Sequence, residues 1–129
     1  MYFDQLVGSE FEPHGDGVST VHLTLRDEHH GPHGFVHGGV YCTLAHQSAG
    51  AAAYSRLAPG HEAAMIGMTV NFVKPTWGGR LHSRSEVIRH GSRTSLVETR
   101  ITGDDGELRA TATSTFLVLQ RVLQPPDRR

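Results

Sequence analysis

The stretch HGGVYCTLAHQSAGAAA, residues 37–53, predicts one long helix around which the rest of the chain is organised. No proline occurs between residues 38 and 57, and alanine, the strongest helix former, is frequent there. Pro59 ends the helix, because it disfavours helical backbone angles at the residue before it. Twenty helical residues form a rod of about 30 Å. The small side chains in its middle allow close packing on a sheet or a partner, or reflect helix propensity alone.

β-structure is predicted on both sides of this helix. Residues 21–25 alternate apolar and polar side chains, which is typical of a half-buried strand, and the Gly- and Pro-rich segment 29–35 predicts a loop. Four more strands are expected at 65–75, 78–91, 92–102 and 107–120, with a GDDG hairpin turn at 103–106. Short connections favour antiparallel neighbours. The expected fold class is α+β, with one long helix on one antiparallel sheet.

Length and composition limit the kinds of protein to consider. A chain of 129 residues is enough for one domain with a modest core, so residues 1–129 are expected to form a single domain, with 120–129 as a frayed tail. The net charge of −1, with no Lys/Arg run, predicts no nucleic-acid partner. The chain has no apolar run of about 18 residues, so no membrane span is predicted. A single cysteine and an N-terminus without a basic segment predict a cytoplasmic protein.

Three segments resemble the hotdog-fold thioesterases of the phenylacetate-pathway type: HGFVHGGVYCTLAHQSAGAAA (33–53), NFVKPTWGG (71–79) and IRHGSRTSLVETRITGDDGELRATATSTFLVL (88–119). The similarity covers roughly residues 17–119. It implies a hotdog fold, in which a five- to six-stranded antiparallel sheet wraps around one central helix. It also implies homodimers paired through their sheets, or tetramers, that hydrolyse acyl-CoA thioesters at sites between subunits. Coenzyme A would enter as part of the substrate, with no cofactor and no metal.

The helix start is the first candidate for chemistry. By resemblance, the backbone N–H of Gly38 or Gly39 points at the thioester carbonyl oxygen. The first N–H groups of a helix lack internal partners and lie at its positive end, so they are suited to stabilising an oxyanion. A tight turn without chemistry is the alternative. His37 is expected to align this turn by bonding backbone groups rather than to react.

The resemblance breaks at position 46. The related enzymes have Asp or Glu nine residues after the histidine of the HGG turn, whereas this chain has His46 and no acid between Glu28 and Glu62. Their common Asn or Gln six residues before that histidine is Gly31 here. An imidazole exchanges protons near neutral pH, so His46 is the candidate base or substrate-binding group. An inert histidine at a dimer seam is the alternative.

Spacing along the helix links these two candidates. Gly39 and His46 are seven residues apart, so they share nearly the same helix face and lie about 10 Å apart along the axis. One reacting carbon cannot touch both groups of a single helix. A site that uses both therefore combines two subunits.

Seven further residues are candidate substrate-binding groups. They are Gln47, Ser48, Thr69, Asn71, Arg89, His90 and Arg93. The first two follow His46 and could orient water or substrate, or else pack and cap. The next two belong to a strand, where ordinary strand polarity explains them equally well. The last three flank a turn that lies near the CoA tail in the resembling enzymes, and arginine suits phosphates, although a solvated hairpin is the alternative.

Five of the ten histidines fall within residues 29–46. His29, His30 and His33 are expected to lie in a solvated loop rather than to bind a metal, because no Cys or acid joins them and Pro32 breaks regular spacing. Cys42 is expected to be a small core residue rather than a nucleophile.

Three functions stay open. The first is hydrolysis of an acyl-CoA, with an aryl or a short to medium acyl group, through His46 or a water that it orients. The second is a hotdog protein that binds acyl-CoA or a related ligand without turnover, because the usual acid is missing. A dehydratase or hydratase ranks last, since the related enzymes place their His–acid pair in other motifs.

Overall fold

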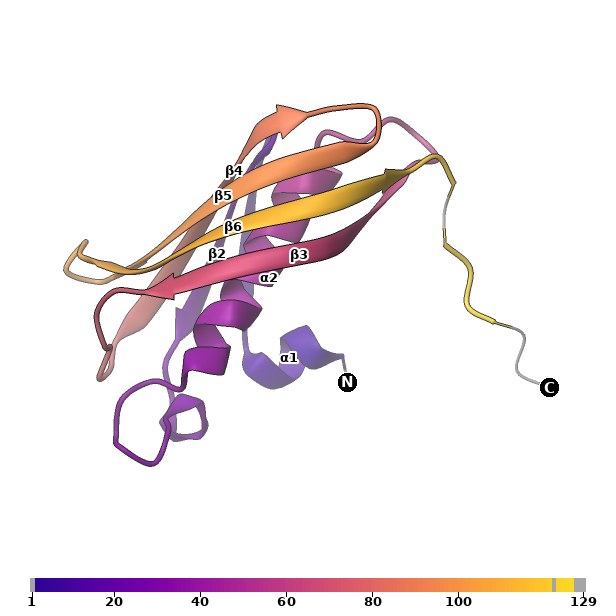
Figure 1. Ribbon diagram of the computed structural model, residues 1–129. Helices are drawn as coiled ribbons and strands as arrows, with labels where there is room; N and C mark the ends of the chain where they lie inside the picture. Colours follow the sequence, from indigo (N-terminus) through magenta and orange to yellow (C-terminus); the bar gives the residue numbers. More distant parts are fainter. Residues whose placement is uncertain (1, 122, 127–129) are drawn as a thin grey trace.

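The computed structural model describes residues 2–121 and 123–126, and one strongly curved sheet partly encloses one long helix (Figure 1). The elements in chain order are α1 (Phe3–Val7), β1 (Glu10–Gly15), β2 (Val18–Thr24), η1 (Asp27–His29), α2 (Gly38–Tyr54), β3 (Glu62–Phe72), β4 (Arg80–His90), β5 (Thr94–Gly103) and β6 (Leu108–Leu119). This arrangement confirms the predicted α+β class and the long helix. No helix among these residues is long and apolar enough to cross a membrane.

The six strands form a single antiparallel sheet in the order β1-β2-β4-β5-β6-β3. The expectation that every short connection joins neighbours is confirmed for β4–β5 and β5–β6 and is wrong for β3–β4. Residues 73–79 carry the chain from one edge of the sheet to the far side of β5, and β3 pairs with β6 instead. As a result, β1 and β3 are the two edges.

Three elements have no counterpart among the predicted ones: the short 3₁₀ helix η1, the strand β1 and the helix α1. The strand β1 is exposed along its whole length, so it lacks the apolar alternation by which a strand is recognised. The helix α1 has only five residues and no buried side chain. It lies against the N-terminal half of α2 (Figure 1), on the side that the sheet leaves open.

The long helix ends earlier than predicted. It stops at Tyr54, not at residue 57, because the Arg56 N–H bonds the carbonyl of Ala53 rather than continuing the helical ladder. The Ser55 hydroxyl donates to the Ala52 carbonyl and accepts the Gly17 N–H at 2.8 Å, which ties this end to the start of β2. Contacts with the rest of the fold therefore set the C-terminal end of α2, which lies before Pro59.

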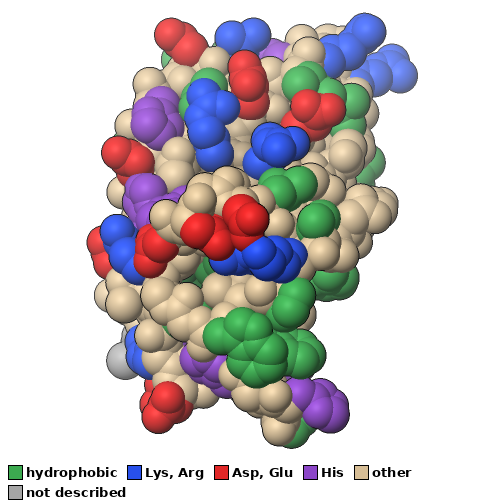
Figure 2. All heavy atoms as spheres, turned by 90° about the vertical axis from the view of Figure 1, so that its left-hand side faces the viewer, with side chains coloured by type: hydrophobic (Ala, Val, Ile, Leu, Met, Phe, Trp, Pro, Cys, Tyr) green, Lys and Arg blue, Asp and Glu red, His purple; other side chains and the backbone are tan. Residues whose placement is uncertain are grey.

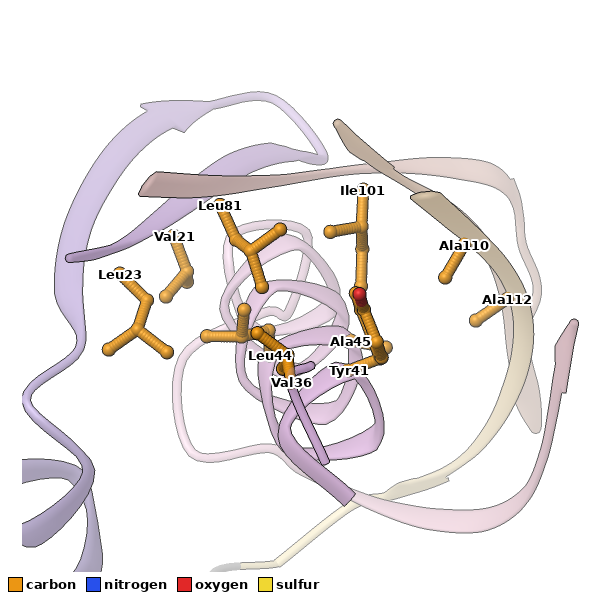
Figure 3. Packing of buried hydrophobic residues seen from close by; sticks show 10 residues of the cluster. All are labelled: Val21, Leu23, Val36, Tyr41, Leu44, Ala45, Leu81, Ile101, Ala110 and Ala112. Carbon is orange, nitrogen blue, oxygen red and sulfur yellow. The ribbon is translucent and has the colours of Figure 1, made fainter. Parts of the chain in front are cut away.

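The main core lies between α2 and the concave face of the sheet (Figure 3). On the helix side it is built from Tyr41, Leu44 and Ala45, and the strands contribute larger side chains such as Leu81 and Ile101. Alanines along α2 let the helix approach the sheet closely, because packing in a protein interior leaves little empty space. The wrapped arrangement therefore depends on small residues in the helix and branched ones in the sheet.

The far end of the chain has no regular element in the described residues 123–126. The N–H of Leu123 donates to Glu62 Oε2 at 2.7 Å, which places this segment beside the start of β3. The frayed tail predicted for 120–129 falls partly on residues 122 and 127–129, which lie outside the described residues, and it stays a prediction.

Candidate active site

The start of α2 is capped by the residue that precedes it. His37 has extended backbone angles, and its Nδ1 accepts the Gly39 N–H at 2.9 Å. The Val40 N–H bonds the His37 carbonyl. No residue of the described chain accepts a hydrogen bond from the Gly38 N–H. Two N–H groups were predicted to donate to the thioester carbonyl. That of Gly39 is already bonded to the His37 cap, whereas that of Gly38 is free.

Gly38 opens onto an apolar groove of about 320 Å³. Its lining consists of Phe35, Val36, Gly38, Tyr41, Phe72, Val73, Lys74 and Pro75. A Cβ at position 38 would lie 3.4 Å from the Phe72 ring, so glycine leaves the amide accessible. The Tyr41 hydroxyl donates to Thr76 Oγ1 at 2.8 Å, which fixes the ring at the base of the groove. This end of the molecule combines a free N–H with aromatic walls.

The mouth of this groove is unusually apolar for a protein surface. Phe72 is 59% exposed and Trp77 64%, and the rings of Phe35 and Trp77 meet edge to face at 5.5 Å. Figure 2 shows hydrophobic side chains gathered low on this face with histidines beside them. Exposed apolar clusters of this kind mark binding grooves or interfaces.

The loop before α2 is held by two histidines. The His29 ring is buried, accepts the Arg26 N–H at Nδ1 and donates from Nε2 to the Val7 carbonyl at 2.8 Å. Both ring nitrogens of His30 lie 2.9 Å from carbonyl oxygens, those of Arg26 and Trp77. The expected solvated position is therefore wrong for His29, which is buried, whereas His30 is only partly buried. They tie the loop to α1 and to the segment after β3.

His30 should make stability depend on pH. Carbonyl oxygens only accept hydrogen bonds, so both ring nitrogens must donate, and only the charged imidazolium does this. The bond to the Trp77 carbonyl, followed by that to the Arg26 carbonyl, raises the pKa of His30 above its ordinary 6.5. A raised folded-state pKa gives stability that is complete below the unfolded-state value and is lost as pH rises through the folded one.

We therefore expect the melting temperature to fall between about pH 6 and pH 8 more in the natural chain than in His30→Gln. The measurement is a series of thermal melts across this range. His33→Gln is the matched control, because His33 lies in the same loop and its ring only stacks on Phe35. Equal pH dependence of the natural chain and His30→Gln would refute the charged bridge.

His46 lies on the face of α2 that the sheet does not cover. Its side chain is exposed and borders a cavity of about 520 Å³ between α2 and α1. The cavity is lined by Phe3, Asp4, Cys42, Thr43, His46 and Gln47. A second cavity of about 520 Å³ adjoins it, shares Phe3 and Thr43, and reaches Gly39 and His37. Gly39 and His46 thus share one helix face, as their spacing predicts, whereas Gly38 opens on another side.

The two residues after His46 have structural partners. Gln47 is 8% exposed, accepts the Ser9 hydroxyl at 2.7 Å and donates to Asp4 Oδ1 at 3.1 Å. Ser48 is fully buried, and its hydroxyl lies within 2.8 Å of the Ser83 and Ser85 hydroxyls. The substrate-binding role predicted for Ser48 is wrong for this fold, because the side chain joins helix to sheet inside the core. Gln47 instead holds α1 in place.

The candidates on β3 point away from the helix. Met68 and Val70 pack on the core, so the alternating Thr69 and Asn71 occupy the opposite, exposed face of the sheet. Within one subunit Thr69 and Asn71 therefore face away from α2, and their substrate-binding role stays a prediction.

The β4–β5 hairpin lies far from Gly38. It projects beyond the end of α2 opposite to its start (Figure 1), and a 17-residue helix spans about 25 Å. Arg89 and Arg93 are exposed there, and His90 is partly buried. Contact of these three residues with the CoA tail would need another subunit and stays a prediction.

Metal-ligating side chains do not gather within residues 2–121 and 123–126, where no group of three His, Cys, Asp or Glu could hold an ion. Cys42 is only partly buried and borders the cavity of His46, so its expected place in the core is wrong. Asp4, on the same cavity, was missed altogether. Nothing in the sequence indicates that a residue 42 positions before His46 would border the same cavity.

Comparison with known proteins finds relatives along most of the chain. A family model described as thioesterase superfamily matches residues 33–110. The 1,4-dihydroxy-2-naphthoyl-CoA hydrolase of Listeria monocytogenes is 25% identical over 121 residues, covering 94% of this chain and 98% of the relative. A Mycobacterium tuberculosis protein provisionally named an esterase is 30% identical over 105 residues, covering 79% and 75%. A solved thioesterase family protein of Silicibacter pomeroyi has a TM-score of 0.85 and 25% identity, covering 92% and 90%.

Proposed function

The chain belongs to the thioesterase superfamily, and from this premise we propose that it hydrolyses acyl-CoA thioesters whose acyl group is apolar, aromatic ones above all. The observation that carries the proposal is the free Gly38 N–H at the positive end of α2, which opens on a groove with aromatic walls. Thioester hydrolysis is the general activity of the family. The acyl preference and the residues are our proposal.

The groove supports an aromatic acyl group. Phe35, Tyr41 and Phe72 line it, and aromatic rings favour edge-to-face or offset contact with a flat ligand. The Listeria relative is named for hydrolysis of a naphthoyl-CoA, which is also an aromatic thioester. A volume of about 320 Å³ is at the lower end of the range typical of ligand pockets, so the acyl group, rather than the whole thioester, is proposed to occupy it.

His46 is proposed to act from a second subunit. Eight residues separate it from Gly38, which is about 12 Å along the helix axis, and the two open on different sides of α2. The 11-residue edge strand β3 leaves one row of backbone groups without a neighbouring strand, and Ile66 on it is 60% exposed. Pairing of two such edges into a homodimer would cover this strand. It could also bring Gly38 of one subunit toward His46 of the other.

The proposed reaction is a single hydrolytic displacement. The Gly38 N–H donates to the carbonyl oxygen, and a water oxygen attacks the carbonyl carbon while His46 accepts the water proton. The C–S bond then breaks, and the CoA thiolate leaves with the proton returned by the imidazolium. His37 is a positioning residue, because its ring engages the Gly39 amide and keeps the turn in shape.

A panel of acyl-CoA thioesters tests the proposal. Thiol release from benzoyl-, phenylacetyl-, acetyl-, hexanoyl- and palmitoyl-CoA is measured with the natural chain, and thermal shift with each compound reports binding separately. We expect turnover of the aromatic compounds to exceed that of acetyl-CoA. A thermal shift without thiol release from any compound would instead support the second candidate, a binding protein, which the lack of a carboxylate on α2 favours.

A further inference from the structure

The cavity beside His46 contains a carboxylate that the helix itself lacks. Asp4, in α1, borders the same space of about 520 Å³ as His46, together with Cys42 and Thr43. The acid is brought there by the docking of α1, not by the sequence of α2. Because α2 contains no Asp or Glu, a carboxylate that acts on His46 must come from another element.

The position of Asp4 is set by an oriented amide. The Ser9 hydroxyl donates to Gln47 Oε1 at 2.7 Å, which turns the amide nitrogen Nε2 toward Asp4 Oδ1, 3.1 Å away. Gln47 is almost fully buried on α2, so this anchor is rigid. Only Oδ1 is used in the bond, and Oδ2 takes no part in it.

The other end of α1 is fixed as well. Arg26 Nη2 donates to the Leu6 carbonyl at 2.6 Å, and His29 Nε2 donates to the Val7 carbonyl at 2.8 Å. Gly8 ends the helix with a φ of 89°, a left-handed conformation that favours glycine. A five-residue helix with no buried side chain would not be stable alone, so these bonds hold it over α2.

We propose that Asp4 is the positioning carboxylate of the hydrolytic site, supplied by α1 in place of the acid missing from α2. This inference rests on the proposed function. When His46 takes the proton of the attacking water, the imidazolium that forms lies across the cavity from the Asp4 carboxylate. The Asp4 carboxylate stabilises that positive charge from across the cavity. The proton goes from water to His46 and then to the departing thiolate.

Other charged groups near the cavity do not replace Asp4. Cys42 is the remaining titratable group in its lining. The adjoining cavity contributes Arg26, Glu28, His29 and His37. Of these, Glu28 forms an ion pair with Arg26 Nε at 3.0 Å, and the two histidines are bonded to backbone groups. Asp4 is therefore the carboxylate available to His46 from this side.

Substitution of Asp4 by asparagine tests the inference. Asparagine keeps the shape and an oxygen that can accept from Gln47, but it removes the charge. We expect Asp4→Asn to lower kcat on the best acyl-CoA by about 10-fold or more and to leave the melting temperature nearly unchanged. KM should stay close to the natural value, because Asp4 is proposed to act on the proton-transfer step and not on substrate binding.

Two further variants separate charge from structure. Asp4→Glu keeps the charge and should recover part of the lost rate. Asp16→Asn makes the same chemical change in the β1–β2 turn, where a φ of 50° is compatible with asparagine, and should leave kcat and KM unaltered. A raised KM with an unchanged kcat, or a melting temperature that falls in step with the rate, would overturn the inference.

The outcome also distinguishes this inference from the function on which it rests. Turnover by the natural chain that Asp4→Asn leaves unchanged overturns the role of Asp4 alone. Absence of thiol release by the natural chain from every acyl-CoA overturns both. A drop in kcat at an unchanged KM, with partial rescue by Asp4→Glu, supports the inference.

Discussion

His46→Ala is expected to lower kcat/KM for the best acyl-CoA substrate by about 10²–10⁴-fold, the usual contribution of a general base. The side chain is exposed on the uncovered face of α2, so its removal leaves no cavity in the core. Alanine is also a strong helix former, which favours an intact α2. The loss should therefore appear in turnover and not in folding.

The measurement is thiol release across pH 5–9. Thermal melts and the oligomeric state are determined for the same samples. His61→Ala is the control, because His61 lies after the helix and its substitution removes the same group from a different place. A well-folded His46→Ala variant that retains the natural rate would show that this face of α2 does not meet the thioester.

Gly38→Pro is expected to lower kcat by about 10²–10³-fold, the typical loss when one oxyanion donor is removed. Proline lacks an N–H, and this amide has no partner in the described chain, so no internal hydrogen bond is broken. Position 38 is the first residue of α2, where proline is well tolerated. His37 has φ −63° and ψ 135°, the extended conformation that a residue before proline prefers.

Gly38→Ala is the matched control, because it adds a side chain and keeps the amide. Its Cβ would lie 3.4 Å from the Phe72 ring, so a moderate rise in KM is expected while kcat stays closer to the natural value. The comparison uses kcat and KM for both variants and a melt of each. Similar kcat values for the proline and alanine variants would exclude the Gly38 amide as the donor.

Most elements of the fold could be predicted, because their signals are local. The alanine-rich run over 38–54, the alternation in β2 and the turn signal at 103–106 each arise from residues close in sequence. The signal was absent where an element buries no side chain, as in β1 and α1. The β3–β6 pairing could not be predicted from connection length, because the seven residues 73–79 are long enough to cross the molecule.

The candidate site could likewise be predicted from the sequence only in part. His46 and the two glycines of the helix start follow from the motif, since all three belong to one continuous helix, but the motif leaves Gly38 and Gly39 as alternative donors. Gly39 and Ser48 belong to the same helix, yet one is held by the His37 ring and the other by buried serines of β4. Sequence spacing gives the direction of a side chain around a helix, but it does not say what lies opposite.

The sequence by itself determined the long helix, the antiparallel strands and the family, because propensity, periodicity and a short motif are properties of neighbouring residues. Tertiary structure alone decided which edge β3 occupies and that Asp4 borders the same cavity as His46. These depend on contacts across 35 to 60 residues of chain, whose geometry is set by packing and by buried hydrogen bonds such as that of Gln47 with Asp4.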